Sequence, residues 1–247
     1  VAIILFKVFI LFVEKRYPKL SIKKFEIKNT SLLFKTFIVF SIAAIFITVG
    51  FEFDIFFSGV FYYGESQFLL QKSDLVSFLF RKILLPFLVI YIFFLPIISK
   101  FTPVHRVFFS HRFSFKEVVF VWVTGITTLI LVVNLLLKNA WGRTRPNDIL
   151  EFGGKDIFSP WYKFGESCIS NCSFVSGDAS VGFMLIVFYF ITNNKSFFYL
   201  ALCCGLLLGF VRIIAGGHFL SDIIFSHIVV TSIIFICFSI YRRFYGE

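Results

Sequence analysis

The sequence predicts an all-α membrane protein, a six-transmembrane-helix bundle, on three observations. Of its 247 residues, 58% are hydrophobic and 15% are charged, a composition that would keep a water-soluble domain of this length in solution poorly. Apolar runs close to the roughly 20 residues needed to cross a bilayer recur along the chain. Internal repeats and low-complexity tracts are absent, apart from an enrichment in phenylalanine. A single membrane domain therefore accounts for the chain.

Six spans account for the apolar runs and leave no polar stretch inside the lipid. In chain order, the predicted spans are Ser31–Gly50, Ile83–Ile98, Val118–Leu137, Ala179–Thr192, Phe197–Ala215 and Phe219–Tyr241. We therefore expect a cytoplasmic or interfacial N-terminal segment at residues 1–30 and a membrane domain at residues 31–247. Within that domain, residues 137–178 form an outer loop.

The N-terminal residues 1–13 form a shorter apolar stretch that contains Lys7. A helix of this length reaches only about 20 Å at about 1.5 Å per residue. We interpret it as an interfacial helix, with a seventh span and a signal peptide as alternatives. Because Met184 is the only methionine, we expect the original start of the chain to be missing.

The distribution of basic residues predicts the orientation. The segments on the side of the two termini carry more Lys and Arg than those on the other side, and the first outer connection, Phe51–Asp74, is mostly acidic among its charged residues. By the positive-inside rule, both termini face the cytoplasm. The net charge of +10 then reflects orientation and contact with anionic lipid headgroups. Nucleic-acid binding is disfavoured, because there is no soluble basic domain to perform it.

The cysteines fall into two groups. Three lie inside predicted spans, where a free thiol behaves as a small apolar group. Cys168 and Cys172 lie in the outer loop, where an oxidising compartment favours a disulfide between them. Free thiols are the alternative, and the absence of histidine from residues 147–175 disfavours zinc.

The segment KNAWGRTRP, Lys138–Pro146, brings three cations to the outer side, against the positive-inside tendency. Lys138 alone could simply extend its amine towards the membrane surface. Together with Arg145, it could bind the oxygens of a phosphate, and Arg143 is a candidate accessory ligand.

The segment GFVRIIAGGHFLSD contains Arg212 near the end of the fifth span and His218 at the start of the sixth. Asp222 follows His218 by one helical turn on the same face. Asp222 can accept one ring N–H, which directs the other nitrogen of His218 outward as a base or nucleophile. The structural alternative is a buried His–Asp pair that only satisfies itself.

The segment CSFVSGDASVGF places Ser176, Gly177 and Asp178 at the start of the fourth span. Backbone N–H groups at a helix start form an anion site, and Gly177 allows close approach to the backbone. Ser176 could also be a plain N-cap. Because the third and fifth spans end outside while the fourth and sixth begin there, all three polar segments are expected at one membrane face.

These segments resemble the type 2 phosphatidic acid phosphatase superfamily. Its pattern is Lys, six residues, Arg-Pro; then Pro-Ser-Gly-His; then Arg, five residues, His, three residues, Asp. The first and third pieces fit this chain at Lys138, Arg145, Pro146, Arg212, His218 and Asp222. The middle piece departs from it, with Val175-Ser176-Gly177-Asp178. A narrower resemblance is to the lipid A 4'-phosphatases, which also have an aspartate at the position of Asp178. The loop GGKDIFSP is similar to these proteins as well.

The resemblance implies a two-step hydrolysis of a lipid phosphate that needs neither metal nor cofactor. His218 would attack phosphorus to give a phosphohistidine, with Asp222 orienting it. The phosphate oxygens would be held by Lys138, Arg145, Arg212 and the Ser176–Gly177 amides. Asp178 would replace the usual histidine as proton donor to the leaving alkoxide. The narrower resemblance implies lipid A as substrate, with the 4'-phosphate favoured, in a bacterial inner membrane with the active site facing the periplasm.

Three alternative functions stay open at this point. A lipid phosphotransferase would have the same motifs, and only its dependence on an acceptor would differ. Another phosphatase could act on phosphatidylglycerophosphate, the lipid A 1-phosphate or an isoprenyl diphosphate. An anion transporter could use the cations, but the His218–Asp222 pair would then be unnecessary.

Overall fold

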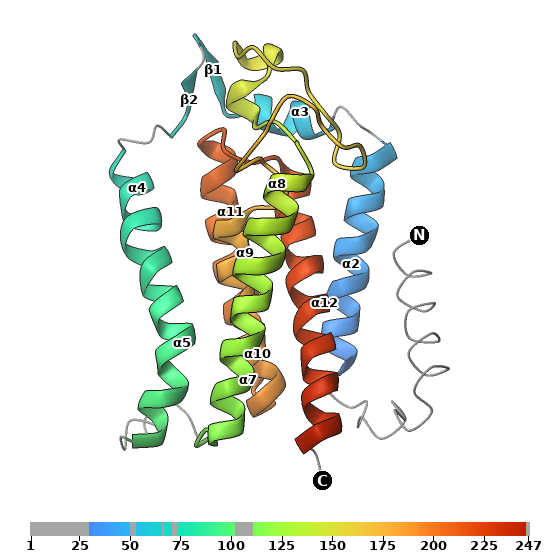
Figure 1. Ribbon diagram of the computed structural model, residues 1–247. Coiled ribbons are helices and arrows are strands. Elements are labelled where there is room, and N and C mark those ends of the chain that lie inside the picture. Colours follow the sequence, from blue (N-terminus) through green and yellow to red (C-terminus); the bar gives the residue numbers. More distant parts are fainter. Residues whose placement is uncertain (1–29, 50–52, 66, 71–73, 102–110, 246–247) are drawn as a thin grey trace.

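The computed structural model describes residues 30–49, 53–65, 67–70, 74–101 and 111–245. The predicted N-terminal segment, residues 1–30, lies almost entirely outside this part of the chain. Long helices run side by side, and the loops and short elements gather at one end of the bundle (Figure 1). The first half contains α2 (Thr30–Val49), α3 (Phe53–Gly59), α4 (Leu75–Phe78), the π-helical segment η2 (Leu79–Leu84) and α5 (Leu85–Phe101).

The second half contains the remaining helices. In order they are α7 (Phe115–Gly125), the π-helical η3 (Ile126–Leu137), α8 (Lys138–Ala140), the 3₁₀ turns η4 (Pro146–Asp148) and η5 (Leu150–Phe152), α9 (Gly177–Met184), α10 (Ile186–Thr192), α11 (Lys195–Ile214) and α12 (Leu220–Tyr245).

Among the described residues, four helical segments are long and apolar enough to cross a membrane: Leu75–Ser99, Phe115–Ala140, Lys195–Ile214 and Leu220–Tyr245. They correspond to the second, third, fifth and sixth predicted spans. The first overlaps the apolar stretch Lys35–Ala44 within α2, and the fourth coincides with the shorter apolar helix Gly177–Thr192. A mostly helical membrane protein is thus confirmed, and the count of six spans stays a prediction.

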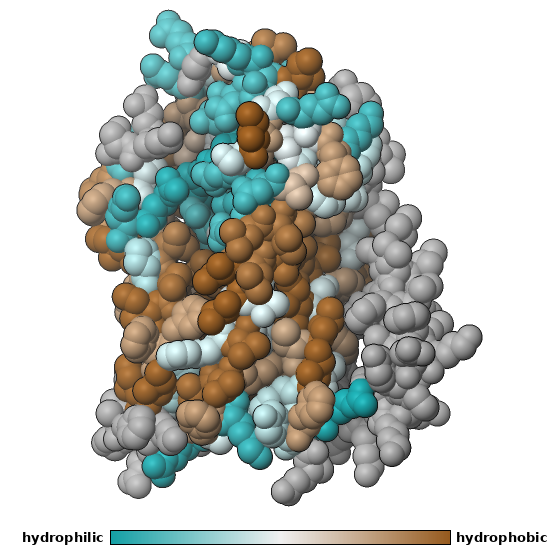
Figure 2. All heavy atoms as spheres, viewed as in Figure 1, coloured by the Kyte–Doolittle hydropathy of each residue, from teal (hydrophilic) through white to brown (hydrophobic). Residues whose placement is uncertain are grey.

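The helices present hydrophobic side chains in a broad band, whereas hydrophilic residues gather over the end with the loops (Figure 2). Large apolar side chains on several helices are exposed, among them Phe46, Phe87, Leu136 and Phe210. An apolar surface of this extent is unusual for a water-soluble monomer. Contact with lipid tails explains it.

The helix formed by α9 and α10 lies inside the bundle. Residues 179–184 of α9 and 186–190 of α10 are all buried. Gly182 of α9 lies directly against α11, because a Cβ there would come within 2.5 Å of the Gly205 nitrogen. Small residues permit such close helix contacts in membranes. This packing fixes the start of α9, where Ser176 lies.

The short strands β1 (Tyr62–Gly64) and β2 (Gln67–Phe68) form an antiparallel hairpin at the loop end. The sequence analysis did not predict this hairpin, because strands this short offer no extended alternation of polar and apolar residues. Phe68 packs with Phe219 in an apolar cluster, and its ring fills the space beside Gly216, where a Cβ would lie 2.4 Å away. Gly216 has φ +62°, which favours glycine. The hairpin therefore supports the turn that carries His218.

Candidate active site

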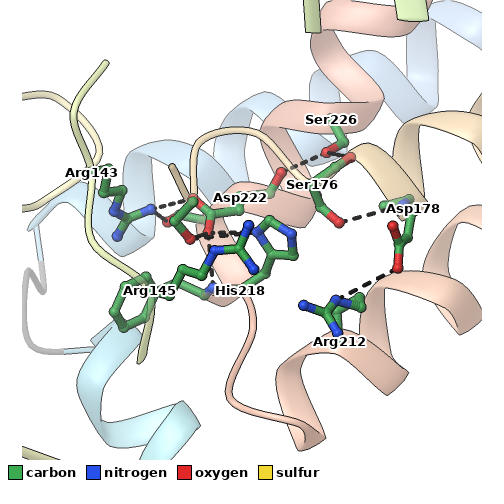
Figure 3. Close-up of polar contacts among 12 residues, drawn as sticks. Arg143, Arg145, Ser176, Asp178, Arg212, His218, Asp222 and Ser226 are labelled. Atoms are coloured by element: carbon green, nitrogen blue, oxygen red, sulfur yellow. Dashed lines mark hydrogen bonds and ion pairs between the residues drawn. The ribbon is translucent and has the colours of Figure 1, made fainter. Parts of the chain in front are cut away.

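The three polar segments of the sequence meet at the loop end of the bundle. The segment of Lys138 meets the segment of Ser176 and Gly177 where Lys138 Nζ lies 3.0 Å from the position a Cβ would take on Gly177. The segment of Asp178 meets the segment of Arg212 where Asp178 Oδ2 lies 3.5 Å from Arg212 Nε. Figure 3 shows Asp178 and Arg212 facing each other, with His218 and Asp222 at the centre of the group.

His218 lies in the turn between α11 and α12 and is almost fully buried. Its Nδ1 is 3.4 Å from both Asp222 Oδ2 and Ser173 Oγ, which leaves Nε2 to react. Burial lowers the pKa of His218 to about 4, despite the opposing hydrogen bond and charge of Asp222. At neutral pH the imidazole is therefore uncharged, the form that has a free electron pair for nucleophilic attack.

The Asp222 carboxylate is fully buried and accepts from several donors. Oδ2 accepts from Ser173 Oγ at 2.5 Å and from the Phe219 nitrogen at 2.9 Å, while Oδ1 accepts from Arg143 Nη1 at 2.5 Å. These bonds compensate the cost of burying the charge. The 3.4 Å distance to His218 is long for a hydrogen bond.

Arg143 does not lie where a phosphate ligand would be needed, which corrects its assignment as an accessory ligand. Its side chain is fully buried behind Asp222, and Nη2 donates to Asp54 Oδ2 at 2.8 Å. Nε donates to the Ser159 carbonyl at 3.0 Å, and the guanidinium lies 4.4 Å from the centre of the Phe219 ring. Burial disfavours the charge, but Asp222 and Asp54 outweigh it and raise the pKa of Arg143 above its ordinary value.

Lys138 follows the π-helical segment η3, and its side chain is buried. The backbone N–H of Lys138 donates to the Val133 carbonyl, five residues earlier, and Asn134 Nδ2 donates to the Leu129 carbonyl at 2.6 Å. Single π-helical turns are frequent at functional sites. Arg145 and Arg212 are close enough to Lys138 to interact with it electrostatically.

Arg212 and Arg81 approach the Asp178 carboxylate from two sides. Arg81 Nε, from η2, is 3.3 Å from Asp178 Oδ2, and Arg212 Nε is 3.5 Å from the same oxygen. Neither contact has the alignment of a hydrogen bond, although both nitrogens and this oxygen are buried atoms. The guanidinium groups therefore retain donors that an incoming anion could use. Sequence reasoning missed Arg81.

Arg145 is held by the loop of the cysteines. Its Nη2 donates to the Asn171 carbonyl at 2.7 Å, and Asn171 lies inside the Cys168–Cys172 disulfide. The expected disulfide is present in the structure, with the two Cα atoms 5.7 Å apart. The Cys172 nitrogen also donates to the Lys138 carbonyl at 3.0 Å. The disulfide loop thus contacts two of the cationic residues.

Ser176 is the N-cap of α9, the role that the sequence left as its alternative. Its Oγ accepts from the Ala179 nitrogen at 3.4 Å, and its carbonyl accepts from Ser226 Oγ at 3.0 Å. A hydroxyl that accepts one bond still carries a proton that it can donate to another group. Gly177 is the first residue of α9 and lies beside Lys138. The start of α9 therefore faces the cations.

Comparison with known proteins identifies the family. The PAP2 superfamily matches residues 118–245 of this chain. The chain belongs to the PAP2 superfamily. The match begins within α7, ends with α12 and covers the three motif segments.

Three curated relatives of this PAP2 chain carry the name Lipid A 4'-phosphatase. The protein from Francisella tularensis subsp. novicida is 44% identical over 104 residues, which is 40% of this chain and 47% of the relative. That from Rhizobium leguminosarum is 36% identical over 98 residues, covering 38% and 42%, respectively. That from Rhizobium etli is 35% identical over 97 residues and covers 38% of each.

The aligned part of the chain spans less than half the length of each of these relatives. The comparison with solved structures found no match. The PAP2 membership therefore rests on the sequence match.

Several polar residues around the PAP2 motifs were missed by sequence reasoning. Ser173, Ser221 and Asp54 all bond to Asp222 or to its partner Arg143. Asp54 precedes the motifs by more than 80 positions and entered the sequence analysis only as a charge that indicates orientation. Ser173 directly follows Cys172, and its position beside the disulfide is the one signal that could have singled it out.

Proposed function

We propose that this protein is a membrane lipid phosphatase that removes a phosphate monoester from lipid A, with the 4'-phosphate favoured. The single observation that carries the proposal is a buried His218 next to Asp222, with the cations Lys138, Arg145 and Arg212 on neighbouring segments of a membrane protein. The names of the three PAP2 relatives support the choice of lipid.

The reaction proceeds in two steps. His218 Nε2 attacks phosphorus, the bond from phosphorus to the sugar oxygen breaks, and a phosphohistidine forms. Lys138, Arg145 and Arg212 stabilise the negative charge on the three equatorial oxygens, together with the amides at the start of α9. Water then attacks phosphorus, the N–P bond breaks, and inorganic phosphate leaves.

Asp178 donates a proton to the departing sugar oxygen in this proposal. The carboxylate contacts Arg81 and Arg212. An arriving phosphate dianion competes with this carboxyl group for both guanidinium groups. Asp178→Asn keeps the shape but cannot donate this proton, so its turnover should fall while substrate binding persists. Unchanged turnover of the intact lipid would rule out this role.

We also propose that the site faces the periplasm across a bacterial inner membrane, in a six-span topology. The positive-inside bias and the disulfide in the site loop support this orientation. A membrane-impermeant reductant added to spheroplasts tests it. Loss of the disulfide in intact spheroplasts supports a periplasmic loop, and loss only after lysis contradicts it.

The test of the main proposal is incubation of the purified protein with bis-phosphorylated lipid A, followed by fragmentation mass spectrometry. His218→Ala removes the nucleophile. His227→Phe is the matched control, because His227 lies further along α12, buried between the rings of Phe40 and Phe183. Loss of the 4'-phosphate with wild type and the control, but not with His218→Ala, is the expected result.

Other outcomes separate the alternatives. Loss of the 1-phosphate would change the substrate position, and untouched lipid A would overturn the choice of lipid. A dependence on an added lipid acceptor would indicate a phosphotransferase. Acid-labile radiolabel on wild type but not on His218→Ala would support the phosphohistidine, and its absence under rapid quenching would contradict it.

A further inference from the structure

Asp54 makes unusually many polar contacts for a residue on the short helix α3. Its carboxylate is 2% exposed. Oδ1 accepts from the Ser221 nitrogen at 3.0 Å, while Oδ2 accepts from Ser221 Oγ at 2.5 Å and from Arg143 Nη2 at 2.8 Å. A buried carboxylate needs such partners, and here they belong to the site loop and to the start of α12.

Arg143 is bound between two carboxylates. Nη2 faces Asp54, Nη1 faces Asp222 at 2.5 Å, and Nη1 also donates to Ser221 Oγ at 2.7 Å. The planar guanidinium holds these groups in fixed directions, which a flexible ammonium group could not do. Moving Asp54 would therefore move the donor that fixes Asp222 Oδ1.

We propose that Asp54 is a positioning residue for the reaction at His218, acting through Arg143 and Asp222. This inference rests on the proposed function. Asp54 itself is separated from the imidazole by two side chains, so it has no contact with the reacting atoms. Its charge and its bonds fix the guanidinium, the guanidinium fixes Asp222, and Asp222 orients the nucleophile.

The charge of Asp54 also determines the charge balance behind His218. Asp54 and Asp222 carry two negative charges against the one positive charge of Arg143, so this group has a net charge of −1. Arg212 from α11 and Lys138 from α8 also act on His218 electrostatically. Removing the Asp54 charge leaves Arg143 balanced by Asp222 alone. A less negative surrounding makes the imidazole less basic and a weaker nucleophile.

The test is Asp54→Asn, alone and combined with Asp222→Asn. The single variant should lower kcat by about 10-fold to 100-fold with KM little changed, because substrate contacts stay intact. In the Asp222→Asn background, the same change should have no further effect, since the path through Asp222 is already broken. An additive loss, a change confined to KM, or wild-type kcat in the single variant would overturn the inference.

Two variants separate positioning from folding. Ser58→Ala is the matched control, because Ser58 is fully buried one turn further along α3 and its hydroxyl has no hydrogen-bond partner among the described residues. It should keep wild-type kcat. Ser221→Ala is the milder perturbation if Asp54→Asn does not fold, and it should lower kcat in the same direction. Wild-type kcat for Ser221→Ala would then overturn the inference.

Binding of orthovanadate, an analogue of the phosphoryl-transfer transition state, provides a second readout that needs no turnover. Asp54→Asn should weaken it about tenfold or more relative to wild type and Ser58→Ala. Equal binding would overturn the role of Asp54. A wild type that binds vanadate but leaves lipid A untouched would instead count against the proposed substrate.

Discussion

Gly217→Ala should displace the Arg212 guanidinium although no charged residue is replaced. A Cβ at position 217 would lie 2.1 Å from Arg212 Nη2 and 2.5 Å from its Cζ. The guanidinium would have to retreat by about 1.3 Å to reach ordinary contact distance. The end of a flexible side chain can make this shift at little cost in stability. A misplacement of about 1 Å at a reacting group can lower the rate on the order of 100-fold.

We therefore expect Gly217→Ala to lose about 100-fold in kcat/KM for the phosphorylated lipid, with a thermal unfolding midpoint near that of the wild type. Gly59→Ala is the control, since a Cβ there would lie 3.7 Å from Phe152, an ordinary contact. Turnover is followed by phosphate release in detergent. Wild-type kcat/KM for Gly217→Ala would show that the observed position of Arg212 is not the one used in the reaction.

Three further predictions concern the same site. Arg81→Ala should lower kcat/KM by about fivefold at most, because the side chain is partly exposed to solvent. The exposed neighbour Lys82 is the control, and Lys82→Ala should have no effect. Equal losses in the two variants would show that Arg81 acts only through the overall positive charge. Reduction of Cys168–Cys172 should lower turnover about tenfold by releasing the carbonyl that holds Arg145, and the double serine variant should be equally slow and insensitive to reductant. The His218 ring, followed by nuclear magnetic resonance, should remain neutral at about pH 5.5, because burial lowers its pKa to about 4. The ring is then protonated only at a pH well below the pKa of free histidine. Half-protonation near pH 6.5 would contradict this.

The convergence of the motif segments could be predicted because it follows from topology. When Lys138, Arg212 and Asp178 occupy helix ends that alternate across a membrane, counting spans is enough to place them on one face. The ring of partners behind Asp222 could not be predicted in this way. Asp54 lies on a short helix in a connection, and no periodicity links it to Arg143.

The assignment of Arg143 failed for a related reason. Its sequence neighbours, Lys138 and Arg145, belong to the proposed phosphate site, and proximity in sequence suggested the same direction for Arg143. Gly142 has a left-handed φ of +65°, whereas Arg145 is extended, so the backbone between Lys138 and Arg145 is not regular. Two buried carboxylates also provide Arg143 with a stronger partner than solvent. A sequence pattern shows which charges exist, but not which of them neutralise one another.

The π-helical turns of η3 affect how this chain can be compared with others. A π-turn holds more residues than an α-turn, so Lys138 arrives on a different face from the one an uninterrupted α-helix would give it. A homologue that lacks the widened turns would need an alignment gap before its lysine to place that amine over the glycine of the next motif. A comparison that aligns the motif letters without such a gap would therefore misplace the lysine.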